Sequence, residues 1–150
     1  MLDIVLELIH HVAVFSLVGI FAAEYVLIRP EMKQGQLRPL AALDAAYGGF
    51  AALVILVGAA RVIWGDAGWQ FYVYNWLFWA KMAAFVAVGG LSGPVTGMLR
   101  RWSSAAKADP GFSPPADQMA RARWLLKAQF AVFPLIPIFA ALMARGIGHF

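Results

Sequence analysis

The sequence predicts an all-α protein that crosses a membrane four times, as a four-helix transmembrane bundle with both termini in the periplasm. The first reason is composition: 62% of the 150 residues are hydrophobic and only 13% are charged. The mean hydropathy is +0.71, whereas a soluble domain is about half apolar and a quarter charged. The second reason is that four apolar segments are each long enough to cross a bilayer, which takes about 20 residues. The third is that Lys and Arg gather in two of the connecting loops.

The first expected helix covers residues 4–28 and carries ionisable residues inside its apolar run. No Lys or Arg precedes it and it is too long for a signal peptide, so we expect a retained helix. Charged groups inside a span are costly and usually face other helices. One stripe of this helix is therefore expected to face inward. It contains His10 and has His11 at its edge, so His10 is the better inward-facing candidate and His11 the alternative. At 100° per residue, that stripe holds Glu7, His10, Val14, Leu17, Phe21 and Glu24.

Prolines mark the ends and bends of the expected helices. Pro30 ends the first helix, because proline cannot continue a helix and restricts the residue before it. Pro94 is expected to kink the third helix, and Pro134 and Pro137 to bend the fourth. Within a single membrane domain of residues 1–150, we expect helices at about 4–28, 41–64, 75–99 and 116–146, and a long loop at 100–116.

Two further patterns concern the third helix. Aromatic side chains crowd the segment before it and at its start, and such residues favour the membrane–water interface over a ligand site. Glycine also recurs every fourth residue along this helix, which suits close helix contact within the chain or in a homo-oligomer. The aromatic residues are Trp69, Tyr72, Tyr74, Trp76 and Trp79, and the glycines are Gly89, Gly93 and Gly97.

The positions of Lys and Arg predict the orientation. The loops after the first and third helices lie on one side of the membrane and are rich in Lys and Arg. The opposite side has only Arg61 and Arg145, both at helix ends. Basic loops stay in the cytoplasm, so we expect a bacterial inner-membrane protein with periplasmic termini. The net charge of +4 then serves lipid headgroups and topology, and no nucleic-acid partner is expected. The loops after the first and third helices hold Arg29, Lys33, Arg38, Arg100, Arg101, Lys107, Arg121 and Arg123.

Antiparallel helices bring the polar residues into two layers. With a rise of ~1.5 Å per residue, the two histidines lie roughly 10 Å below the outer edge of the first helix. The outer layer comprises His10, His11, Arg61 and Lys81, with Arg145 shallower. The inner layer comprises Glu24, Asp44 and Tyr47, with Lys127 as a further candidate.

The outer layer suits a haem b site. Histidine is the usual axial ligand of haem iron, and Arg or Lys can pair with the propionates. His10 or His11 would be the metal ligand, and Arg61 and Lys81 would complete the cofactor site. Because the two histidines are adjacent on one helix and His149 is too shallow, the second axial position would stay open, take a ligand other than His, or take a ligand from another subunit. A quinone headgroup would suit the same layer.

Structural roles are the alternative for every polar residue. A membrane His can hydrogen-bond a neighbouring helix, and Arg61 and Lys81 can extend to the headgroups. Glu24 with Arg29, and Asp44 with Lys127, would then be buried ion pairs. The absence of Cys excludes thiolate sites, and no spacing typical of a hydrolase occurs.

Motifs along nearly the whole chain resemble a family of predicted four-helix bacterial membrane proteins of unknown function. More distantly, a His, an Arg and a Trp with a Lys on the first three helices resemble HemJ-type protoporphyrinogen oxidases, which bind haem b, and copper-resistance D membrane domains. That resemblance implies functional roles for His10 or His11 and for Lys81. The motifs are His10-His11, Glu24, Arg29-Pro30, Asp44-x-x-Tyr47-Gly48, Arg61, Phe78-Trp79-Ala80-Lys81 and the segment 144–148.

Two functional hypotheses follow. The first is a haem b-binding, redox-related membrane protein, of which a haem-dependent membrane oxidoreductase is one form. The second is a non-enzymatic accessory or assembly subunit of a larger membrane complex. The lipid bilayer is a partner in both, and a quinone or other membrane subunits would be further partners.

Overall fold

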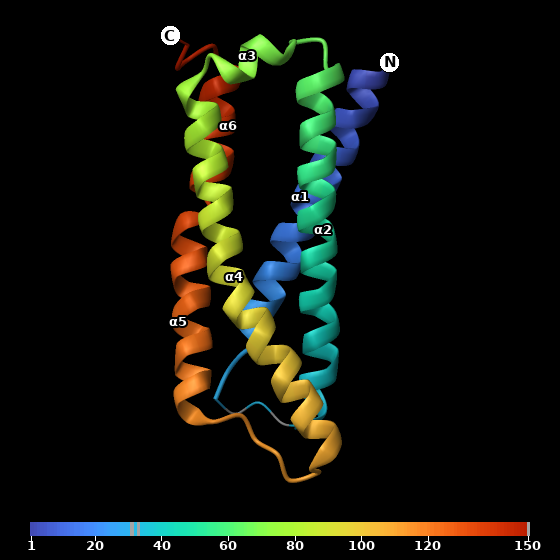
Figure 1. The fold of residues 1–150 in the computed structure, drawn as a ribbon, viewed down its shortest axis with the longest axis vertical. Coiled ribbons are helices and arrows are strands. Elements are labelled where there is room, and N and C mark those ends of the chain that lie inside the picture. The colour runs from blue at the N-terminus through green and yellow to red at the C-terminus, as the bar shows by residue number, and fades with distance from the viewer. Residues whose placement is uncertain (31, 33, 150) are drawn as a thin grey trace.

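The computed structural model describes residues 1–149 except 31 and 33 (Figure 1). Four helical segments are long and apolar enough to cross a membrane, which confirms the predicted all-α fold and four spans. The described residues form no strand, only an isolated bridge between Asn75 and His149. The elements are α1 (Leu2–Leu27), η1 (Gln34–Gln36), α2 (Leu37–Trp64), α3 (Trp69–Val73), α4 (Trp76–Ala108), α5 (Ala116–Val132) and α6 (Leu135–Ala144).

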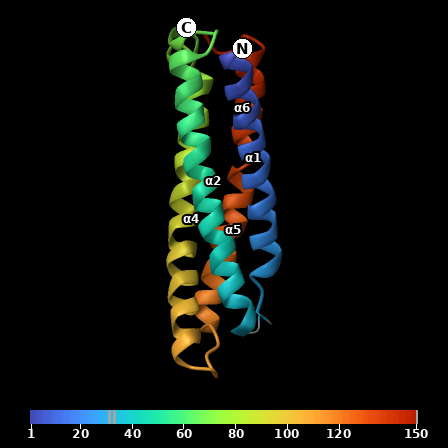
Figure 2. The same cartoon turned by 90° about the vertical axis from the view of Figure 1, so that its right-hand side faces the viewer.

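The four spans run alternately up and down one long axis (Figures 1 and 2). Both chain termini lie at one end, which we call the terminal end, and α3 lies across it (Figure 1). The loops between α1 and α2 and between α4 and α5 lie at the opposite end, the loop end. Helix α1 packs along α2, helix α4 packs on α5 and α6, and α2 joins the two groups through α4.

The hydrophobic core lies in the half of the molecule nearer the loop end. Here α4 crosses toward α2, and Leu17 and Phe21 of α1 meet residues of α2, α4 and α5. Toward the terminal end, the α1–α2 pair and the α4–α6 pair diverge (Figure 1). The buried members of the core are Leu17, Phe21, Ile28, Met32, Leu37, Leu40, Tyr47, Val95, Met98, Leu99, Trp102, Met119, Ala122, Leu125 and Leu126.

The third span is longer than predicted. Helix α4 continues to Ala108, so the prediction of a loop from residue 100 is wrong, and the connection is only residues 109–115. The extension holds because Trp102 is buried and its indole Nε1 donates to Gln118 Oε1 of α5 at 2.8 Å. No Gly or Pro occurs between Gly97 and Pro110, so nothing in this stretch interrupts the helix. The second helix likewise begins at Leu37 rather than at residue 41.

The fourth span is divided. Helix α5 ends at Val132 and α6 begins at Leu135, so the chain breaks at Phe133-Pro134, where a bend was predicted. Pro137 lies within α6, near its start, where a missing backbone N–H costs little. Helix α6 ends at Ala144 rather than at residue 146, because Gly146 has a positive φ of 75°.

Asn75 fixes the chain end against the start of α4. It is fully buried, and its side-chain oxygen accepts a hydrogen bond from Leu77 N at 2.9 Å as the N-cap. Its Nδ2 donates to the carbonyl of Ile147 at 2.9 Å, and Trp76 N donates to Gly148 O at 3.0 Å. Gly148 has a φ of 95°, and a Cβ there would lie 2.6 Å from the Asn75 side-chain oxygen.

The glycines of α4 make no close contact within the chain. A Cβ built on Gly89, Gly93 or Gly97 would meet no atom of a neighbouring element within 4 Å among the described residues. The described residues therefore show no close helix contact at these glycines, and contact in a homo-oligomer stays a prediction. This face of α4 is open to lipid or to another helix.

Candidate functional site

His10 lies at the centre of the outer layer. It is half-buried on α1, as the stripe with Leu17, Phe21 and Glu24 predicts. Its ring rests against Gly58 of α2, where Cε1 lies 3.4 Å from the position that a Cβ would take. Its Nδ1 is buried and has no hydrogen-bond partner among the described residues.

Two cations share the depth of His10. Arg61 of α2 and Lys81 of α4 lie close enough to interact electrostatically with the imidazole. Arg61 Nη2 pairs with Glu7 Oε1 at 3.5 Å, while its buried Nε has no partner among the described atoms. Lys81 Nζ lies over the Phe78 ring at 5.4 Å from its centre, within cation–π distance. Three helices thus bring together His10, Arg61 and Lys81 of the predicted outer layer.

His11 points away from this group. It is exposed, and its Nδ1 lies 2.9 Å from the backbone carbonyl of Glu7, which accepts the hydrogen bond. The rings of His10 and His11 meet edge to face at 6.3 Å. His149 lies beside Phe71 of α3, with ring centres 5.1 Å apart, at the end of the molecule rather than in the layer.

The donor set of the outer layer fits a single imidazole ligand. Among the described residues, no three or more His, Asp or Glu side chains gather to hold a metal ion, so a metal ion bound by imidazoles and carboxylates alone does not fit the outer layer. A haem group needs only one protein ligand to its iron, because the porphyrin supplies the other four nitrogens. His10 offers one imidazole beside Arg61 and Lys81, which fits that requirement.

The inner layer is a second polar group, buried in the core. Glu24 of α1 is 2% exposed and Asp44 of α2 is 3% exposed. The Thr96 hydroxyl of α4 donates to Asp44 Oδ1 at 2.8 Å, and Gln129 Nε2 of α5 donates to the Tyr47 hydroxyl at 2.8 Å. We call Glu24, Asp44, Tyr47, Thr96 and Gln129 the inner cluster.

Thr96 and Gln129 were not predicted as members of the inner cluster. Gln129 had a usable signal in the sequence, because it is an amide directly before the apolar run that extends from Phe130 to the end of the fourth span. Thr96 gave less, because a hydroxyl in a helix often bonds its own backbone.

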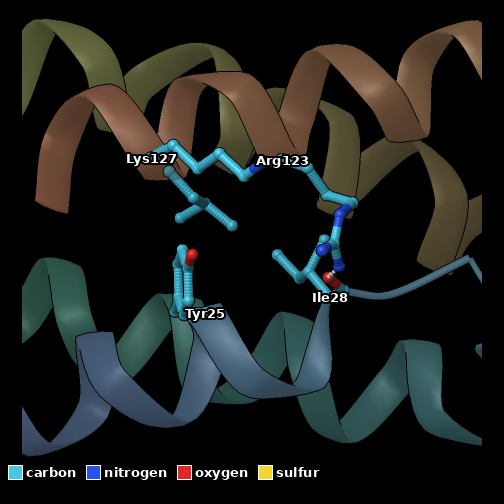
Figure 3. A pocket seen from close by; sticks show the side chains of 5 residues that line it. Tyr25, Ile28, Arg123 and Lys127 are labelled. Carbon is cyan, nitrogen blue, oxygen red and sulfur yellow. Dashed lines mark hydrogen bonds between the residues drawn. The ribbon is translucent and has the colours of Figure 1, made fainter.

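Lys127 does not belong to this cluster. It is exposed, and with Tyr25, Ile28, Arg123 and Leu126 it lines a hollow between α1 and α5 that is too narrow for a water molecule (Figure 3). There Arg123 Nη1 donates to the carbonyl of Ile28 at 2.7 Å and holds the end of α1 (Figure 3). The predicted Asp44–Lys127 pair is therefore wrong: Asp44 bonds Thr96, because residue 127 faces a different side of α5.

The burial of the other ionisable residues follows the prediction with one qualification. Glu24 and Asp44 are buried, and His10, Arg61 and Lys81 are half-buried. The side chain of Glu7 is 47% exposed, and it is held by the pair with Arg61 rather than by burial. Arg29 is exposed and forms no ion pair with Glu24 in the described part of the chain.

Comparison with known proteins gives one family. A family model described as a predicted membrane protein, DUF2214, matches residues 2–148. No curated protein and no solved structure matches the chain. The more distant resemblance to HemJ-type oxidases and copper-resistance D domains is not shown by these comparisons.

Proposed function

The chain belongs to the DUF2214 family of predicted membrane proteins, and with this as premise we propose that it binds haem b in a redox-related role. The family and the four spans make it a multi-pass membrane protein. The observation that carries the proposal is the inward-facing His10, whose buried Nδ1 lacks a partner among the described residues beside Arg61 and Lys81.

Each residue of the outer layer has a role in this proposal. His10 would hold the iron, and Gly58 would leave room for the imidazole against α2. Arg61 and Lys81 would pair with the propionates, with Glu7 keeping the Arg61 guanidinium in place. Haem b would supply one-electron chemistry, and an apolar protein shell sets its potential. A quinone headgroup could exchange electrons at the same layer.

Localisation forms part of the proposal. The loop end carries Arg29, Arg38 and Lys107 together with the arginines of α4 and α5, whereas the terminal end has few basic residues. This asymmetry favours a bacterial inner membrane with periplasmic termini, and in that orientation the outer layer would lie near the periplasm. Lys33, which was counted with the loop end, lies outside the described residues.

A visible spectrum tests the haem proposal. The wild-type protein, expressed with ample haem and purified, should show a Soret band. His10→Ala should abolish that band, because the iron loses its axial ligand, while Lys81→Met should shift it or leave it unchanged.

The matched control is His11→Ala, because His11 has the same chemistry but points outward. It should keep the Soret band of the wild type. A colourless wild-type protein, or equal loss of colour in the two His variants, would contradict the assignment to His10.

A second candidate is an accessory or assembly subunit of a membrane complex. It is favoured by the open glycine face of α4, where Gly89 and Gly93 are exposed and a Cβ would meet nothing within 4 Å. Such a face lets another helix approach closely. If the wild type is colourless and Gly89→Leu abolishes co-purification of another membrane subunit, this candidate replaces the first.

A further inference from the structure

The inner cluster is a second polar site, which the proposed haem role does not use. Its five side chains come from all four spans, and all but the half-buried Thr96 are buried. A polar group at this depth in a membrane usually has a function and needs a partner. The question is therefore which partner the cluster lacks.

The cluster has more oxygen acceptors than donors. Thr96 donates to Asp44, and Gln129 Nε2 donates to Tyr47, but Glu24 Oε1 and Gln129 Oε1 remain buried without any donor from the described residues. Glu24 is 2% exposed and Gln129 is 1% exposed, so bulk water does not satisfy them. Leaving a buried acceptor unpaired is unfavourable, and more so for a charged group.

The free amide oxygen belongs to the same site as the carboxyls. Gln129 is tied to the Tyr47 hydroxyl at 2.8 Å, and Tyr47 lies within electrostatic range of both Glu24 and Asp44. The two carboxyl groups also act on each other. Tyr47 thus links Gln129 of α5 to the two carboxyl groups of α1 and α2.

With both carboxyls ionised, the cluster would carry one negative charge more than its neighbours balance. Two carboxylates contribute −2, and Arg100 of α4 is the cation that acts on Asp44. No ion pair reaches Glu24 or Asp44 within the described ranges. Arg123 and Lys127 of α5 lie beside Tyr25 instead (Figure 3).

We propose that the inner cluster binds one small monovalent cation, a sodium ion or a proton, between Glu24, Asp44 and Gln129. One positive charge cancels the excess, and carboxylate, amide and hydroxyl oxygens are the ligands that hard cations prefer. Because the five side chains come from α1, α2, α4 and α5, the cation would connect the α1–α2 pair to the α4–α5 pair.

The test measures thermal unfolding of the purified protein in detergent. One series replaces choline chloride by sodium chloride at fixed pH and ionic strength, and a second varies pH without sodium. A ligand that binds the folded state raises its unfolding temperature as the ligand concentration rises. We expect the wild-type midpoint to rise with sodium, or, if the bound cation is a proton, to fall as the pH rises without a sodium effect.

Glu24→Gln should abolish whichever dependence the wild type shows, because it removes the charge that the cation neutralises. Asp66→Asn is the matched control, since it makes the same change in an exposed turn, and it should behave as the wild type does. If Glu24→Gln does not fold, Gln129→Met keeps both carboxyls and should shift the dependence to higher cation concentration.

A wild-type midpoint that responds to neither sodium nor pH would overturn the proposal. So would the full wild-type response in both Glu24→Gln and Gln129→Met. The haem experiment stays separate, because His10 lies in the other layer and its Soret band does not report on the inner cluster.

Discussion

Two neighbouring residues show how finely position decides a role. His10 and His11 have the same side chain, yet the 100° turn between them directs one against Gly58 of α2 and leaves the other exposed on its own helix. The same rule separates Gln129, which reaches Tyr47, from Lys127 two residues earlier, which lies beside Tyr25. In a membrane the difference is functional, because only the inward residue can share a site with other helices.

Asn75 gives a prediction at this scale. Asn75→Ala removes the N-cap of α4 and leaves the Ile147 carbonyl without its donor, so we expect a loss of about 2 kcal/mol of stability. Hydrogen exchange should show faster opening of residues 145–149 in this variant.

Asn75→Asp separates the two hydrogen bonds, because it keeps the cap acceptor and loses the donor to Ile147. It should free the C-terminal segment while keeping the start of α4 protected. Gln70→Ala, an exposed amide on α3, is the control and should change neither. Unchanged exchange at residues 145–149 in Asn75→Ala would refute this role.

At the scale of elements, the last turns of α4 are polar, whereas the rest of the helix is apolar. Its first part has the composition of a membrane span, whereas residues 100–108 are polar and charged and continue the helix toward the loop end. Trp102 lies in this part and packs in the hydrophobic core with Leu99 and Met119. A single buried aromatic side chain thus extends a helix beyond the apolar run that defines it in the sequence.

Trp102→Ala should therefore destabilise the protein strongly. Large-to-small changes of a buried Trp cost about 3–5 kcal/mol, and here Gln118 also loses its indole donor. Denaturant titration should show the loss, and Trp102→Phe should recover most of it because it refills the core.

Trp124→Ala is the matched control, since Trp124 lies on α5 with 64% of its surface exposed. It should unfold close to the wild type. Equal losses at positions 102 and 124 would show that the packing of Trp102 is not what extends α4.

At the scale of the whole molecule, two polar layers are separated by an apolar middle. The core closes the half near the loop end, and the helix pairs diverge toward the terminal end (Figure 1). The basic residues of the loop end and the aromatic residues around α3 mark the two membrane surfaces. The molecule is thus polarised along its axis, with a tightly packed half and a more open half.

Orientation in the membrane is the prediction at this scale. Alkaline phosphatase fused after residue 150 should be active, because the basic loops keep the other end in the cytoplasm. The same enzyme inserted in the 109–115 connection should be inactive, and a cytoplasmic reporter there should be active. The reverse pattern at both sites would contradict the predicted orientation.

The sequence by itself determined the fold class, the four spans and the inward stripe of α1. These follow from hydrophobic length and from helical periodicity, which act within one segment. It also placed His10, Arg61 and Lys81 at one depth, because antiparallel spans convert residue number into depth. The continuation of α4 past residue 99 was missed, because its stability comes from Trp102 packing on another helix.

Only the tertiary structure decided which polar residues meet. Asp44 accepts a hydrogen bond from Thr96 and does not pair with Lys127. Tyr47 accepts one from Gln129, and Arg61 forms an ion pair with Glu7. These pairings join residues 52, 82 and 54 positions apart. They depend on how whole helices rotate and cross. That arrangement results from many weak contacts between helices, and it produces no periodic pattern in the sequence.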